Sequence, residues 1–207
     1  MPSITHFEIY RPAEPCNLVG DKLREAMDRV IKDRLSANGR EFDVKGFCIG
    51  RNGITLFAED ERLANVKRLN LGGNRIGDEG LKALSESMVF SKLQWLELGG
   101  NDITAEGIES LAGAETVLRK LKTVNLYRNY LKDEGAIIFA KKNKLANLEE
   151  VDLAQNEIGD KGLIALSDSK AFPNLTAMYL DNNFTSMEAR EDARVGVNFR
   201  KLQSLNL

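Results

Sequence analysis

Cysteine, histidine and tryptophan are scarce in this sequence of 207 residues, which contains two cysteines, one histidine and one tryptophan. Cys16 and Cys48 are too few for a disulfide framework, and such cysteine usage is typical of a reducing compartment. His6 lies near the N-terminus, and no two cysteine or histidine residues have the spacing of a metal site. The sequence therefore predicts no catalytic residue, no metal and no cofactor.

Long apolar runs and an excess charge of one sign are also missing. No run approaches the roughly 20 apolar residues of a transmembrane helix, and the N-terminus lacks the basic start and apolar core of a signal peptide. The 29 basic and 31 acidic residues nearly cancel, which argues against sequence-independent binding to nucleic acid. We therefore expect a cytoplasmic protein that binds neither nucleic acid nor a membrane.

A motif with a fixed asparagine recurs along most of the chain. Five full copies begin at Val66, Leu93, Leu121, Leu148 and Leu175, a truncated copy begins at Leu202, and a short, looser copy begins at Val44. The starts from Val66 onward are 27 or 28 residues apart. Places one, four and six of each full copy are apolar, and place nine is Asn74, Asn101, Asn129, Asn156 or Asn183. The short copy has Asn52 at place nine.

The double glycine of the stretch LNLGGNRIGDEG, residues 69–80, is part of this motif. It occurs in only two of the full copies. A loop that wraps phosphate would occur once, between a strand and a helix, usually with a following lysine and a serine or threonine. We therefore interpret the stretch as a repeat and not as a nucleotide site.

The motif resembles the leucine-rich repeat, L-x-x-L-x-L-x-x-N-x-L. Its period of 27 to 28 residues is similar to that of the ribonuclease-inhibitor-like class, which Ran GTPase-activating proteins and NOD-like receptors share. The resemblance implies an α/β fold, a right-handed horseshoe arc with parallel strands on the concave face and helices on the convex face. We divide the chain into an N-terminal segment, residues 1–43, and repeats, residues 44–207.

The residues of each copy predict the same elements independently of the family. Apolar and polar residues alternate around places four to six, which is typical of a short strand buried on one face. Apolar residues at helical spacing follow the asparagine, as at Leu81 and Leu84, and predict a returning helix. The early acids Asp78, Glu79, Asp133 and Asp160 suit helix N-termini, and Thr104 is a candidate N-cap.

Both ends of the repeat array need a cover for their apolar cores. Leu23, Met27, Val30, Ile31 and Leu35 form one helical stripe, with Asp21 as its candidate N-cap and Asn38-Gly39 as its stop. This helix is either a cap or a partner-binding element, and we favour the cap. Residues 4–11 alternate like a strand without an evident place. At the other end the last strand is uncapped, which indicates either pairing of two copies as a homodimer or a fragment of a longer protein.

Outward-pointing strand positions are the candidate site, because large aromatic side chains there have no packing role. Places three, five and seven carry three of the five tyrosine and tryptophan residues, among acids. The predicted partner-binding residues are Arg68, Trp95, Glu97, Tyr127, Glu150, Asp152, Tyr179 and Asp181. In the short copy the outward residues are Gly46, Cys48 and Gly50. Aromatic residues often dominate interface energies, and the acids favour a basic partner.

The leading hypothesis is a non-catalytic protein–protein interaction module that binds a protein or peptide with a basic surface. The ribonuclease inhibitor works in this way, which the resemblance implies. Two alternatives stay open on the same repeats. One is a regulator of a GTPase, for which Arg51, Arg75 or Arg128 would be the weakly supported candidates. The other is a ubiquitin-ligase adaptor, including the bacterial-effector type.

Overall fold

The computed structural model describes residues 14–207 as an arc of parallel strands that alternate with helices. His6 and the alternating segment at residues 4–11 lie outside this range. The seven strands of the sheet follow in sequence order: β1 (Glu41–Asp43), β2 (Arg68–Asn70), β3 (Trp95–Glu97), β4 (Thr123–Asn125), β5 (Glu150–Asp152), β6 (Ala177–Tyr179) and β7 (Ser204–Asn206). The predicted fold class is therefore confirmed.

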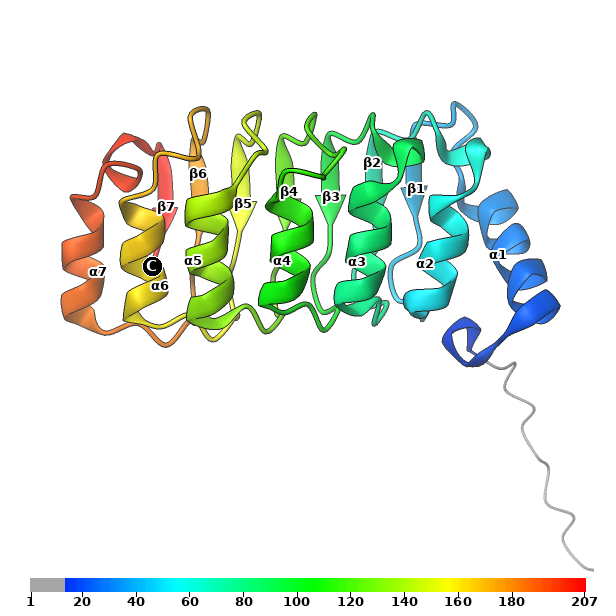
Figure 1. Ribbon diagram of the computed structural model, residues 1–207, viewed down its shortest axis with the longest axis horizontal. Helices are drawn as coiled ribbons and strands as arrows, with labels where there is room; N and C mark the ends of the chain where they lie inside the picture. Colours follow the sequence, from blue (N-terminus) through cyan, green and yellow to red (C-terminus); the bar gives the residue numbers. More distant parts are fainter. Residues whose placement is uncertain (1–13) are drawn as a thin grey trace, which may run out of the picture.

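Helices return the chain from one strand to the next. Within residues 14–207 the α-helices are α1 (Gly20–Arg34), α2 (Gly50–Ala58), α3 (Gly77–Glu86), α4 (Ala105–Ala112), α5 (Lys132–Lys142), α6 (Asp160–Ser167) and α7 (Met187–Arg194). Single 3-10 turns are η1 (Pro15–Asn17), η2 (Glu61–Leu63), η3 (Met88–Phe90) and η4 (Phe199–Lys201). Figure 1 shows α2 to α7 side by side in front of the sheet, with α1 at one end of the stack. No helix in this range is both long and apolar enough to cross a membrane.

The strands pair in register, so equivalent places of successive repeats lie side by side. Arg68 pairs with Trp95, Trp95 with Thr123, and Thr123 with Glu150. The central residue of each strand points into the core, as fully buried Leu69 does, and its two neighbours point outward. The alternation predicted from the repeat is confirmed.

The asparagines at place nine form one buried column. Asn101 is typical: its Oδ1 accepts hydrogen bonds from the backbone N–H groups of Asn74 (3.1 Å) and Ile76 (3.4 Å), and its Nδ2 donates to the carbonyl of Leu71 (2.9 Å). The column thus links each turn to its neighbours and satisfies backbone groups that no regular element serves. It has one gap, because Oδ1 of Asn156 has no hydrogen-bond partner in the described chain, although its Nδ2 donates to three carbonyls.

Acids at the helix starts form a second link between repeats. Asp78 in α3 accepts hydrogen bonds from the backbone N–H groups of Thr104 (2.8 Å) and Gly107 (3.0 Å) at the start of α4. Asp133 accepts from two N–H groups at the start of α6 in the same way. Thr104 caps its own helix, as predicted. The acids therefore serve the N-terminus of the next helix, where a negative charge is favoured.

The second glycine of each pair provides a left-handed turn residue. Place eight has a positive φ throughout, with 69° at Gly73 and 64° at Gly100. Arg128 and Gln155 adopt similar values of 55° and 54° without being glycine. The turn tolerates a side chain in the later repeats, but glycine adopts it without strain.

Helix α1 packs its apolar stripe against the core of the first repeat. Leu23, Met27, Val30 and Ile31 are buried against this core. The helix ends at Arg34, earlier than the predicted stop, because residues 35–41 turn back toward β1. This turn is held by Asn38, whose Oδ1 accepts from the Arg40 N–H (3.0 Å).

The predicted frame of the first repeat is wrong. Phe42 pairs with Leu69, so β1 lies upstream of the frame that began at Val44, and Val44 is at place six. Phe47 stands at the asparagine place, which is why the sequence search instead selected Asn52, a residue of α2. Gly46, Cys48 and Gly50 are therefore not outward strand residues. The outward residues of this repeat are Glu41, Asp43 and Lys45. Glu41 and Asp43 flank Phe42, the buried centre of β1.

The two cysteines form a disulfide, contrary to the expectation from their number. The Cα atoms of Cys16 and Cys48 lie 5.3 Å apart, because α1 runs back along the first repeat and brings η1 against the turn before α2. Their separation of 32 residues hid this proximity in the sequence. Cysteine usage therefore does not support a reducing compartment, and the cytoplasmic location stays a prediction.

Strand β7 is the last of the sheet. It pairs with β6, and within residues 14–207 no strand lies on its other side. In α7, Arg190 replaces the apolar residue of other repeats and donates to the Leu207 carbonyl (3.4 Å). Pairing of two copies through β7 stays a prediction.

Candidate binding face

The eight predicted partner-binding residues lie on the concave face of the sheet. Arg68, Trp95 and Glu150 begin their strands, Glu97, Asp152 and Tyr179 end theirs, and Tyr127 and Asp181 follow shortly after strand ends. Parallel register brings all eight to one surface. Two of the aromatic residues, Trp95 and Tyr179, are half-buried, whereas Tyr127 is exposed.

The residues at place five have a structural role that the sequence analysis missed. From β1 to β5 each accepts a hydrogen bond from the backbone N–H two residues later. The acceptors are Asp43 (3.1 Å), Asn70 (3.2 Å), Glu97 (2.7 Å), Asn125 (2.7 Å) and Asp152 (2.9 Å). The sequence does carry a sign of this role, because place five is an acid or an amide in each strand from β1 to β5. Asparagine and aspartate are therefore equally able to hold the strand end.

The first glycine of the double glycine makes room for this bond. A Cβ atom on Gly99 would lie 2.7 Å from Oε1 of Glu97. The glycine therefore lets the Glu97 carboxylate fold back onto the strand end, where it accepts from the Gly99 N–H (2.7 Å). The connection between the double glycine and the candidate site is visible only in the folded geometry.

Glu97, Asp152 and Asp181 form a cluster of negative charge that we call the acidic row. Burial raises the pKa of Glu97 and of Asp152, although each accepts a backbone hydrogen bond that acts in the opposite direction. Like charge adds to the increase, from Asp152 on the pKa of Glu97 and from Asp181 on the pKa of Asp152, whereas the nearby cation Lys45 lowers the pKa of Glu97. None of the three forms an ion pair within the described chain. The ionised form of Glu97 and Asp152 is therefore disfavoured in the folded protein.

Trp95 contacts Arg68 of the neighbouring strand β2. The guanidinium carbon of Arg68 lies 4.4 Å from the centroid of its ring, a cation–π contact between adjacent strands. This pair faces a hollow of about 300 Å³, which we call the Trp95 hollow. Its lining residues are Arg40, Glu41, Lys67, Arg68, Gln94, Trp95, Lys122, Thr123 and Glu149. The concave face thus has a basic hollow at the starts of β2 and β3, and the acidic row forms an acidic edge at the strand ends.

Exposed apolar side chains also occur outside the strands. Tyr130 and Phe184, both at place ten, are 49% and 72% exposed, and Met187 at the start of α7 is 70% exposed. All three lie between the end of a strand and the first turn of the following helix. The alternation of the strands could not predict their exposure because they lie outside the strands.

Comparison with known proteins identifies the repeats. A family model described as a leucine-rich repeat matches residues 62–85, 91–112 and 144–167. A solved structure of an internalin from Listeria monocytogenes matches with a TM-score of 0.50 and 23% identity, over 74% of this chain and 37% of the internalin. The chain is a leucine-rich repeat protein. No curated protein sequence matches it.

Leucine-rich repeat domains are typically non-catalytic modules that bind proteins. In this leucine-rich repeat protein, the one cluster of three potential metal ligands among residues 14–207 is Glu14 with Cys16 and Cys48. Both thiols are consumed by the disulfide, so the cluster is not a metal site. The internalin match supports the fold alone. This chain covers little more than a third of the internalin, so the match says nothing about a ligand.

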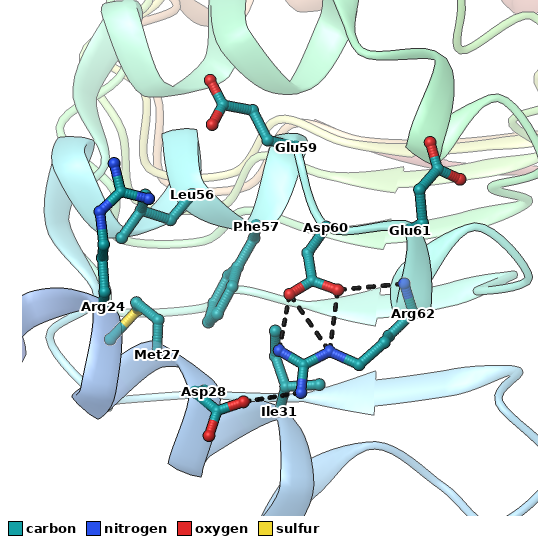
Figure 2. Close-up of a pocket in the computed structure, with 10 residues that line it drawn as sticks. All are labelled: Arg24, Met27, Asp28, Ile31, Leu56, Phe57, Glu59, Asp60, Glu61 and Arg62. Carbon is teal, nitrogen blue, oxygen red and sulfur yellow. Dashed lines mark hydrogen bonds and ion pairs between the residues drawn. The ribbon is translucent and has the colours of Figure 1, made fainter.

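A second pocket of the leucine-rich repeat protein lies between α1 and the end of α2, and its role is structural. Figure 2 shows Arg62 between two carboxylates, with hydrogen bonds to Asp60 (2.6 Å) and Asp28 (2.8 Å). The bond from Arg62 lowers the pKa of Asp60, and hydrogen bonds from Lys32 and then Arg62 lower the pKa of Asp28. Since its guanidinium is already shared, Arg62 joins the cap to the first repeat and is not a free ligand group.

Proposed function

We propose that this leucine-rich repeat protein is a non-catalytic binding module whose acidic row holds a basic segment of a partner protein or peptide. The supporting observation is the choice of residue at Glu97 and Asp152. An amide at place five holds the strand end equally well, as Asn70 and Asn125 do. A half-buried, unpaired carboxylate is less favourable for folding than an amide, so the charge itself has a use, which a cation supplied by a partner would provide.

Aromatic residues beside the acidic row support the same proposal. Tyr179 lies on β6 next to Asp152 on β5, and Tyr127 follows the end of β4. Tyrosine and tryptophan are frequent anchors of interfaces because they bury large, rigid surfaces. A basic segment that lies along the strand ends would contact both the carboxylates and these rings.

The test uses a defined basic probe, fluorescein-labelled hexalysine, and fluorescence anisotropy at low salt. The double variant Glu97→Gln, Asp152→Asn keeps both strand-end hydrogen bonds and should bind the probe about tenfold more weakly. Glu134→Gln, which removes an exposed acid from helix α5 on the convex face, is the matched control and should bind normally. Equal affinity of the double variant and the wild type would refute the proposal. A partner is then identified from proteins that the wild type retains and the double variant loses.

The ribonuclease-inhibitor-like class is part of the proposal, supported by the period of 27 to 28 residues and by a helix in each return. A GTPase-activating role gains no support from its candidate arginines. Arg51 is ion-paired with Glu79, and Arg75 and Arg128 are left-handed turn residues. A role in ubiquitin ligation likewise has no observation in its favour.

A further inference from the structure

The Trp95 hollow has the opposite charge to the acidic row. Arg40, Lys67 and Arg68 line it, and within residues 14–207 none of these three forms an ion pair or a side-chain hydrogen bond. A fourth cation, Lys122, is neutralised by Glu149 at 2.7 Å. Glu41 is the remaining carboxylate of the lining. The hollow therefore has an excess of unpaired positive charge.

Arg68 is placed to bind an anion. Its guanidinium stacks on the Trp95 ring, which fixes the plane of the group while its N–H edges stay free. A planar guanidinium held in this way matches a carboxylate, with two parallel N–H···O bonds. The ring provides an apolar wall for the aliphatic part of the same side chain. Trp95 is thus both a contact surface and a support for Arg68.

The size of the hollow favours a side chain over a whole small molecule. Its volume of about 300 Å³ lies at the lower limit of ligand pockets, and it is open to solvent along the strand starts. Because it is continuous with the proposed binding face, one partner segment can occupy both.

We infer that the Trp95 hollow binds an acidic side chain of the partner protein, so that the bound segment is dipolar. The inference rests on the proposed function and deepens it. The partner's carboxylate lies at the strand starts, near Arg68, and its basic group lies at the strand ends, near Asp152. Two residues along a strand and three strands across, from β2 to β5, give a separation of about 16 Å. An extended segment spans this distance in roughly five residues.

The experiment measures binding of fluorescein-labelled hexaglutamate by anisotropy, with the emission of Trp95 as a second readout. Trp95 is the only tryptophan of the chain, so a change in its emission locates the ligand. We expect Arg68→Gln to weaken binding about tenfold and Lys67→Gln to weaken it by a smaller factor. The control Lys161→Gln removes an exposed cation from helix α6 on the convex face and should leave binding unchanged.

Three outcomes would overturn the inference: no binding of hexaglutamate, binding without a change in Trp95 emission, or equal affinity of the Arg68→Gln and Lys67→Gln variants with the wild type. An octauridylate probe tests the other polyanion that fits an aromatic, basic hollow. If octauridylate depends on Arg68 while hexaglutamate does not bind, the site is for single-stranded nucleic acid and the inference fails.

The two proposals fail separately. Hexalysine binding tests the proposed function at the acidic row, and hexaglutamate binding tests the inference at the Trp95 hollow. Failure of one probe to bind leaves the test with the other probe intact. If both homopolymers bind, the peptide Glu-Glu-Gly-Gly-Lys-Lys should bind more tightly than either of its halves alone. A normal melting temperature of Arg68→Gln, an exposed residue, confirms that the variant is folded.

Discussion

At the scale of single residues, the side chains that hold this protein together are short and polar. Each asparagine of the column acts as donor and acceptor at once, and its burial is tolerated because backbone groups satisfy it. The acids at helix starts do the same for the next helix. Because these bonds repeat with the sequence period, the sequence alone predicted the column correctly. It did not predict the gap at Asn156.

The gap allows a matched comparison of two asparagines. Asn101→Ala removes both the acceptor and the donor bonds of a buried amide, and should lower the free energy of unfolding by about 1–3 kcal/mol. Asn156→Ala should cost less, because its Oδ1 accepts no bond in the wild type. Urea unfolding followed by circular dichroism measures both. A larger loss at Asn156 would contradict the account of the column.

At the scale of elements, α1 shows where sequence patterns succeed and fail. Its apolar stripe predicted a cap, and the structure buries that stripe on the first repeat. The frame of the first repeat was missed because Phe47 occupies the asparagine place and no local pattern marks the register. The disulfide was missed because it depends on how η1, α1 and the first turn are arranged in space. Sequence periodicity specifies the elements, whereas contacts across unlike elements depend on the folded chain.

The disulfide should stabilise the folded protein because it restricts the conformations of the unfolded chain. Its loop spans 32 residues, for which the entropy of closure predicts roughly 3–4 kcal/mol. The double variant Cys16→Ser, Cys48→Ser should therefore unfold at lower urea than the oxidised wild type. Reduction of the wild type should lower its stability to that of the variant and leave the variant unchanged. If reduction has no effect, the cap is held by its apolar contacts and by Arg62 alone.

At the scale of the whole molecule, charge is separated across the concave face while the net charge is only −2. Counting residues could not detect this, because the cations of the Trp95 hollow and the carboxylates of the acidic row cancel in the composition. The eight outward residues were identified from period two alone, and the register brings them together. The place of Arg68 in a basic hollow apart from the acidic row required the side-chain contacts, above all that of Arg68 with Trp95.

The acidic edge makes the stability of the molecule depend on pH. The pKa of Asp152 is raised in the folded state, so the folded chain holds this proton more tightly than the unfolded chain does. Its ionisation therefore opposes folding, and the penalty develops as pH rises from about 4 through the raised pKa. Asp152→Asn removes the penalty and keeps the bond to the Ala154 N–H, as Asn125 does for Tyr127.

We expect the Asp152→Asn variant to melt at a higher temperature than the wild type at pH 7, with the difference smallest near pH 3. Thermal unfolding by circular dichroism across this range measures it. Glu134→Gln, on the exposed side of α5, should show no such dependence. A variant that is less stable at neutral pH would mean that the carboxylate is needed for the fold.

The covalent link between Cys16 and Cys48 also changes what a cut in the chain would do. The exposed turn at Asn38, between the cap and β1, lies inside the loop that this link closes. A protease that severed the backbone there would not release the cap. Two fragments would migrate as one species until a reductant was added, and the apolar end of the arc would stay covered after the cleavage.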